Sequence, residues 1–154
     1  MAPELWVGAY VEPEDFAWLA TALGVRAVLS LQDDFDLASK RLVLGDLEDA
    51  ARASGVAFAR IPVTDGDSVG LARRLPDAVA LLAELIRAHG PTYLHCNAGI
   101  NRAPTVAIAY LHVHHALPLR DAIEYLKTRR VCLPYVSALE AAYLGRPSLR
   151  TRTS

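Results

Sequence analysis

Cys96 and Arg102 are the residues whose types and spacing most directly suggest chemistry. They form a C-x5-R pattern, with His95 directly before the cysteine and Gly99 three residues after it. The bare pattern arises often by chance, whereas the added histidine and glycine make it rare. A short apolar strand precedes Cys96 and a helical pattern follows Arg102, so the loop joins a strand to a helix. The pattern predicts a loop that binds a phosphate group.

The physical properties of such a loop explain the residue types. Backbone N–H groups that turn inward, together with the positive end of the helix dipole, can hold a tetrahedral dianion without a metal. Gly99 allows a backbone conformation that other residues avoid. The planar guanidinium of Arg102 can bind two phosphate oxygens at once, and the same inward field stabilises the thiolate of Cys96 as a nucleophile. The predicted loop comprises Cys96, Asn97, Ala98, Gly99, Ile100, Asn101 and Arg102.

Phosphate-ester hydrolysis through a phosphocysteine also needs a group that moves protons at the ester oxygen and at water. We expect a carboxylic acid on a polar loop, and Asp65, 31 positions before Cys96, is the candidate. Asp67 in the same loop is the alternative. We do not expect His95 to be a base; its expected role is to donate hydrogen bonds that fix the loop backbone.

The elements that must position these residues follow from hydrophobic patterning. Short apolar runs predict strands at 5–8, 26–31, 56–61 and 93–95, with a loop at 32–36. The longest periodic segment, 75–89, predicts a helix with Pro76 in its first turn. Trp6, Trp18 and Tyr110 lie at apolar-periodic positions and are predicted core residues. Strands alternating with helices predict one layered α/β domain over 1–145, followed by a flexible tail at 146–154.

Composition limits the possible partners. The chain has 154 residues, 53% of them apolar, with a formal net charge of -1. This balance provides no broad field for nucleic acid or a membrane surface, so we expect neither as a partner, and we expect a monomer. Cys96 and Cys132 lie far apart in the sequence, with no C-x-x-C pattern and no ligand-spaced Cys/His set, which favours a reducing compartment over a disulfide framework. The start of the chain does not resemble a leader, so we expect a cytoplasmic location. We expect no metal and no cofactor.

The sequence resembles the cysteine-dependent dual-specificity phosphatases over about residues 5–143. His95–Arg102 matches their H-C-x-x-G-x-x-R loop, 5–8 matches their opening strand, and 23–31 matches their second-strand block. The resemblance implies a protein-tyrosine-phosphatase-like α/β fold, with a mixed sheet of four or five strands flanked by helices. It implies Cys96 as nucleophile, Arg102 as phosphate clamp and Asp65 as general acid, acting on phosphotyrosine and phosphoserine or phosphothreonine in proteins.

Within this family the sequence is most similar to the plant glucan phosphatases and to laforin, through 31–37, 74–76, 99–104 and 130–134. A phosphoglucan or another non-protein phosphate ester is therefore an alternative substrate, and a non-catalytic phosphate-binding module is a second alternative. Most of the family has Ser or Thr after the arginine, where its hydroxyl stabilises the departing thiolate. Ala103 stands there in this chain, so we expect slow hydrolysis of the phosphocysteine.

Overall fold

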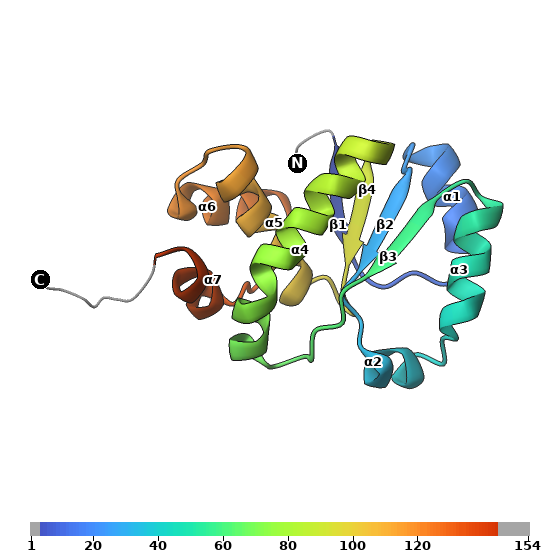
Figure 1. Cartoon of the computed structure of the whole chain (residues 1–154), viewed down its shortest axis with the longest axis horizontal. Coiled ribbons are helices and arrows are strands. Elements are labelled where there is room, and N and C mark those ends of the chain that lie inside the picture. Colours follow the sequence, from blue (N-terminus) through green and yellow to red (C-terminus); the bar gives the residue numbers. More distant parts are fainter. Residues whose placement is uncertain (1–3, 145–154) are drawn as a thin grey trace, which may run out of the picture.

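A computed structural model describes residues 4–144 as a four-stranded sheet covered on both faces by helices (Figure 1). The elements, in chain order, are β1 (Leu5–Gly8), α1 (Asp15–Ala22), β2 (Ala27–Ser30), α2 (Asp34–Ser39), α3 (Leu44–Ala53), β3 (Ala57–Arg60), α4 (Ser68–His89), β4 (Thr92–His95), α5 (Arg102–His114), α6 (Leu119–Arg129) and α7 (Val136–Tyr143). The predicted tail at 146–154 lies outside the described residues, and the domain boundary at 145 stays a prediction.

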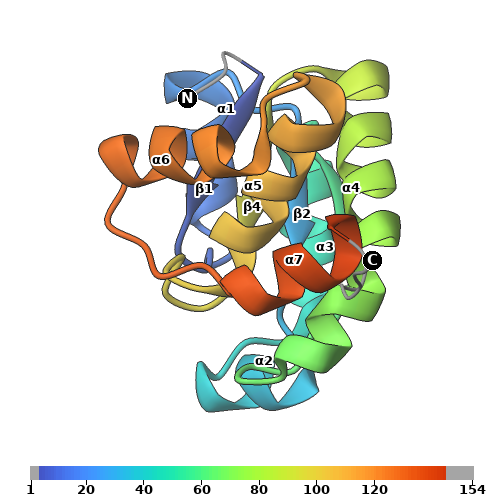
Figure 2. The same cartoon turned by 90° about the vertical axis from the view of Figure 1, so that its left-hand side faces the viewer.

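The sheet has the order β1-β4-β2-β3, and all its strand pairs are parallel. The predicted protein-tyrosine-phosphatase-like α/β fold is confirmed. The described sheet has four strands, within the expected four or five, and all its pairs are parallel, whereas a mixed sheet was expected. Helices α1 and α3 cover one face, while α4 and α5 pack on the other. Figure 2 shows α7 beside α4 and α5. The carboxyl ends of all four strands therefore meet at one edge, where parallel α/β sheets place their sites.

The core lies on both faces of the sheet, as the near-continuous apolar character of β2 predicts. Val28 packs with Phe16 and Leu47 beneath α1 and α3, whereas its neighbour Leu29 packs with residues of α4 and α5. Every residue of β2 is buried. The predicted core position of Tyr110 is confirmed, whereas those of Trp6 and Trp18 are wrong, because these two side chains are 40% and 58% exposed.

Two elements differ from expectation near the carboxyl edge. Helix α4 begins at Ser68 rather than at 75, because the Asp67 side chain caps it by accepting from the Gly70 N–H at 2.8 Å. Pro76 consequently lies inside the helix rather than in its first turn. The segment expected to be a loop at 32–36 instead enters α2.

Helix α2 is short, and its start is stabilised by reciprocal side-chain hydrogen bonds. The N–H of Asp36 donates to the Asp33 carboxylate at 2.8 Å, and the N–H of Asp33 donates to the Asp36 carboxylate at 2.9 Å. This capping box fixes Asp36 beyond the end of β2. Arg60, at the end of β3, holds the same segment through Asp34 at 2.7 Å and the Gln32 carbonyl at 2.8 Å. Within residues 4–144 no helix has both the length and the apolar character that a membrane crossing needs.

Candidate active site

The predicted phosphate-binding loop lies between β4 and α5 at the carboxyl edge of the sheet. Strand β4 ends at His95, and α5 begins at Arg102. Cys96 is 3% exposed and Arg102 is 1% exposed, so both are reached only through the small hollow that the loop surrounds. This hollow has a volume of about 50 Å³ and is lined by Asp65, Cys96, Asn97, Ala98, Ile100, Asn101 and Arg102.

Every carbonyl of the loop from Cys96 to Asn101 accepts a hydrogen bond from outside it, whereas the N–H groups of 97–101 donate to no acceptor in the described chain. In a peptide unit the C=O and N–H groups point in opposite directions. Because donors outside the loop hold its carbonyls outward, the N–H groups of the same peptide units point toward the hollow, as anion binding requires. In order from Cys96 to Asn101, the donors are the His95 ring, the N–H of Tyr10, Arg130, Arg130 again, the N–H of Leu133, and the hydroxyl and N–H of Thr105.

Gly99 is required by both conformation and space. Its φ is +71°, in the left-handed region that favours glycine. A Cβ at this position would lie 2.6 Å from the backbone carbonyl of Gly8, at the end of β1. The loop thus packs directly on the neighbouring strand, and a larger residue would push it away.

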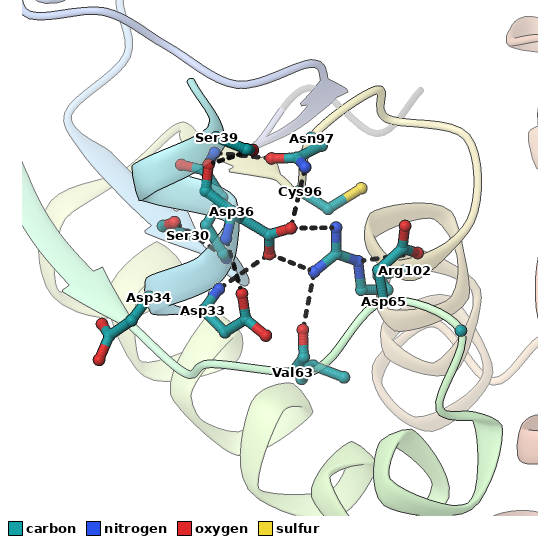
Figure 3. Close-up of polar contacts among 12 residues, drawn as sticks. Ser30, Asp33, Asp34, Asp36, Ser39, Val63, Asp65, Cys96, Asn97 and Arg102 are labelled. Carbon is teal, nitrogen blue, oxygen red and sulfur yellow. Dashed lines mark hydrogen bonds and ion pairs between the residues drawn. The ribbon is translucent and has the colours of Figure 1, made fainter. Parts of the chain in front are cut away.

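The Arg102 guanidinium is held by hydrogen bonds on one edge, and its other edge faces Asp65 (Figure 3). Its Nη1 donates to the Asp36 carboxylate and to the Val63 carbonyl, both at 2.7 Å, and its Nη2 donates to Asp36 Oδ1 at 3.4 Å. Its Nε has no hydrogen-bond partner in the described chain and lies 3.6 Å from Asp65 Oδ1. The Nε–H and the second N–H of Nη2 therefore form a free edge that can bind two phosphate oxygens in the bidentate arrangement that arginine favours, in place of the contact with Asp65.

Asp36 is the buried partner of this arginine, and sequence reasoning missed it. Besides Arg102, its carboxylate accepts from the N–H of Asp33 at 2.9 Å and from the Asn97 side chain at 2.9 Å. The Gln32 side chain in turn donates to the side-chain oxygen Oδ1 of Asn97 at 2.8 Å. Burial alone would raise the pKa of Asp36, but hydrogen bonds from Arg102 and Asp33 and the charge of Arg102 hold that pKa below its ordinary value. The D-x-x-D capping pattern at 33–36 was the available signal.

His95 is fully buried beneath the loop. The pKa of His95 is lowered to about 4, mainly because burial disfavours the charged ring. The charge of Arg102 also lowers this pKa, whereas the hydrogen bond to the Cys96 carbonyl raises it. The ring is therefore neutral near pH 7, and its Nδ1 donates to that carbonyl at 2.9 Å. This geometry suits the predicted role of fixing the loop backbone.

The two candidate acids occupy different positions. Asp65 lines the hollow and is 60% exposed, with its Oδ1 close to Arg102 Nε. Asp67 caps α4 and does not line the hollow. The structure therefore brings Asp65, Cys96 and Arg102 together and leaves Asp67 in a structural contact.

The Cys96 sulfur faces the N-terminus of α5. The N–H of Ala103 donates to Sγ at 3.5 Å. Ala103 itself is buried and carries only a methyl group, so no side-chain hydroxyl adds to this contact. A thiolate at Cys96 is thus stabilised by a backbone N–H and by the helix dipole alone at this end of the loop.

Comparisons with known proteins agree with this geometry. Residues 10–137 match the family described as "Dual specificity phosphatase, catalytic domain". The chain belongs to this family of cysteine-dependent phosphatases, and the assignment predicted from the sequence is confirmed.

Individual relatives include both plant and animal proteins. The chain is 33% identical over 143 residues to "Phosphoglucan phosphatase DSP4, amyloplastic" of Castanea sativa, covering 91% of this chain and 38% of the relative. It is 24% identical over 139 residues to laforin of Mus musculus, covering 83% and 42%. The chain thus spans about two fifths of the length of either relative. The crystal structure of human DUSP28 superimposes with a TM-score of 0.73 at 27% identity, covering 92% of each chain.

Proposed function

We propose that this protein hydrolyses phosphomonoesters on proteins, including phosphotyrosine and phosphoserine or phosphothreonine, through a phosphocysteine intermediate. One observation carries the proposal: the Cys96 sulfur, the free edge of Arg102 and the Asp65 carboxyl border a single hollow of about 50 Å³. A hollow of this size suits one phosphate group, and the N–H groups of the loop face it. The three chemical functions that phosphate transfer needs therefore converge on one phosphorus position.

In the first step, the Cys96 thiolate attacks phosphorus while the loop N–H groups and Arg102 bind the three non-bridging oxygens. The S–P bond forms and the P–O ester bond breaks. Protonated Asp65 gives its proton to the departing ester oxygen, so the product leaves as a neutral alcohol. Charge spreads over the bound oxygens in the transition state, where fixed N–H groups and the guanidinium stabilise it most.

In the second step, a water molecule attacks the phosphocysteine. Asp65, now ionised, takes the proton from this water, the P–S bond breaks, and inorganic phosphate is released. Cys96 leaves as a thiolate that accepts from the Ala103 N–H. Asp65 alternates between acid and base, which suits a carboxyl group that remains open to solvent.

A shallow site supports breadth toward the alcohol portion of the ester. Asp65 is 60% exposed, and Leu133, whose N–H binds the Ile100 carbonyl, is 67% exposed. The reacting phosphate therefore lies near the surface, within reach of the short serine side chain as well as the longer tyrosine. A deep pocket would admit tyrosine alone.

A phosphoglucan is the second candidate substrate. The observation that favours it is the 33% identity to a plant phosphoglucan phosphatase across 91% of this chain. Phosphate release from phosphotyrosine and phosphoserine peptides, measured beside release from solubilised phosphoglucan, separates the two candidates. The proposal predicts a higher kcat/KM on the peptides, and a higher value on the glucan would replace it with the second candidate.

Turnover of para-nitrophenyl phosphate tests the reaction itself. We expect Cys96→Ser to abolish turnover and a metal chelator to leave it unchanged. Cys132→Ser is the matched control, because Cys132 is buried outside the hollow, where burial raises the pKa of its thiol. Tight phosphate binding with no Cys96-dependent turnover would instead identify a non-catalytic binding module.

We also propose that the protein acts as a monomer in the cytoplasm. All the residues named above come from one chain, and both cysteines are free thiols. A nucleophilic thiol works only while reduced, which a reducing compartment ensures. Light scattering of the active protein tests the first statement, and fractionation of its source cells tests the second.

A further inference from the structure

Tyr135, directly before α7, reaches across to the loop that carries the general acid. The N–H of Gly66 donates to the Tyr135 hydroxyl at 3.0 Å, and this hydroxyl lies 3.5 Å from Asp65 Oδ1, to which it donates. A tyrosine hydroxyl can accept one hydrogen bond and donate another, so the two contacts form together. The residue therefore contacts both the backbone of the acid loop and the acid itself.

The position of Tyr135 is fixed from the phosphate-loop side. Its N–H donates to the Thr105 hydroxyl at 2.8 Å, and this hydroxyl donates to the Asn101 carbonyl at 2.7 Å. Two residues earlier, Leu133 exchanges hydrogen bonds with the same loop: its N–H donates to Ile100 and its carbonyl accepts from the Asn101 side chain, both at 2.7 Å. A line of hydrogen bonds thus connects the phosphate-binding loop to the acid through Tyr135.

The acid loop has few other contacts. Thr64, Asp65 and Gly66 are exposed, and Gly66 has a φ of +83°. In the described chain, Asp65 is bound from other elements only by Tyr135 and by Arg102. When phosphate occupies the hollow, the free edge of Arg102 binds phosphate oxygens instead. Tyr135 is then the contact that still holds the acid in place.

We propose that Tyr135 is a positioning residue that keeps the Asp65 loop over the hollow and selects which carboxyl oxygen transfers the proton. This inference rests on the proposed function. Both contacts of the carboxyl group, with Tyr135 and with Arg102, involve Oδ1. Oδ2 is therefore the oxygen that gives its proton to the ester oxygen and later takes one from water.

The test is the kcat/KM of Tyr135→Phe on two aryl phosphates. This ratio reports the steps through formation of the phosphocysteine, in which the ester oxygen departs. Phenyl phosphate has a poor leaving group and needs the acid, whereas para-nitrophenyl phosphate needs it far less. We expect a loss of about tenfold with phenyl phosphate and less than about threefold with para-nitrophenyl phosphate. Tyr125→Phe is the matched control and should change neither value, because Tyr125 on α6 packs against Arg129 away from the hollow.

A double-mutant comparison separates positioning from general stability. If Tyr135 acts through Asp65, the change Tyr135→Phe should cost nothing further in an Asp65→Asn background. Equal losses on both substrates, an undiminished loss in the Asp65→Asn background, or no loss with phenyl phosphate would each overturn the inference alone. Absence of Cys96-dependent turnover in the unchanged protein would overturn the proposed function as well.

Discussion

The two sides of the hollow are built in opposite ways. On one side, Arg102 is 1% exposed and is held by Asp36 and Val63 at 2.7 Å. On the other side, Asp65 is 60% exposed and is held by a single hydroxyl at 3.5 Å and an arginine nitrogen at 3.6 Å. In the proposed reaction, phosphate is thus bound by a buried group and protons are moved by an exposed one.

This difference has a chemical reason. A dianion is bound best by donors that need no rearrangement when the charge arrives, and burial keeps such donors in place. A carboxyl group that first protonates the departing alcohol and then takes a proton from the attacking water must let the alcohol leave and the water enter beside it, which an exposed loop allows. We therefore expect changes to the buried partners of Arg102 to affect stability and phosphate binding together, and changes to Asp65 to affect turnover alone.

The largest expected effect comes from Asp36→Asn. Removing one charge of a buried ion pair leaves Arg102 uncompensated, which typically costs about 3–5 kcal/mol of unfolding free energy. Urea unfolding measures this loss, and weaker binding of vanadate should accompany it. Asp34→Asn on the same helix is the control: its carboxylate is 94% exposed and pairs with Arg60, so we expect a change within about 1 kcal/mol. Equal effects of the two changes would contradict the assignment of Asp36 to the core.

The buried histidine predicts a pH dependence of stability. Its pKa is about 4 in the folded protein against an ordinary value of 6.5, so between these values the unfolded chain takes up a proton that the folded protein does not. The free energy of unfolding should therefore fall as the pH falls from 6.5 toward 4, by up to about 3 kcal/mol. Denaturant unfolding across this range measures it. His95→Asn should flatten the dependence, whereas replacement of the exposed His89 should keep it, and the reverse result would refute the assignment.

On the exposed side, Asp65→Asn should lower kcat/KM with phenyl phosphate about 100-fold and leave the unfolding free energy unchanged. The loss should be much smaller with para-nitrophenyl phosphate. Asp67→Asn is the comparison: it weakens the cap of α4, so we expect a loss of stability of about 1 kcal/mol with little loss of turnover. A larger loss of activity from Asp67→Asn than from Asp65→Asn would transfer the acid role to Asp67.

The smallest expected effect is at Ala103. A hydroxyl introduced by Ala103→Ser would lie beside the Cys96 sulfur, whose present contact is a backbone N–H at 3.5 Å. We expect phosphocysteine hydrolysis to become about threefold to tenfold faster, an effect of about 0.7–1.4 kcal/mol. Rapid-quench measurements should show a burst in the unchanged protein and a smaller one in the variant. No burst in either protein would contradict the expected slow second step.

The parts that could be predicted from sequence are those with a local signature. The loop at 96–102 combines a cysteine, a glycine and an arginine at fixed spacing, and the strands before it show continuous apolar runs. These features predicted the fold class and the family, which are confirmed. The sequence favoured Asp65 over Asp67 as the acid but left Asp67 as the alternative, because only the structure shows that Asp67 caps α4.

The parts that could not be predicted depend on contacts between distant segments. Asp36 and Arg102 are 66 positions apart, and no spacing rule connects them. Val63 contributes a backbone carbonyl, which any residue could supply, so its identity carries no signal. Trp18 illustrates a different limit: periodicity marks an apolar face, but whether another element covers that face is decided by tertiary packing.

The outside support of the phosphate-binding loop has a consequence for the order of folding. Its carbonyls are held by Tyr10 near the start of the chain and by Arg130 and Leu133 near its end, and its arginine is held from α2. Contacts across such long stretches of chain form after local ones, because loop closure must come first. Fragments lacking either end should therefore bind no phosphate. During refolding, the return of Cys96-dependent turnover should report completion of the whole domain rather than of its central strands.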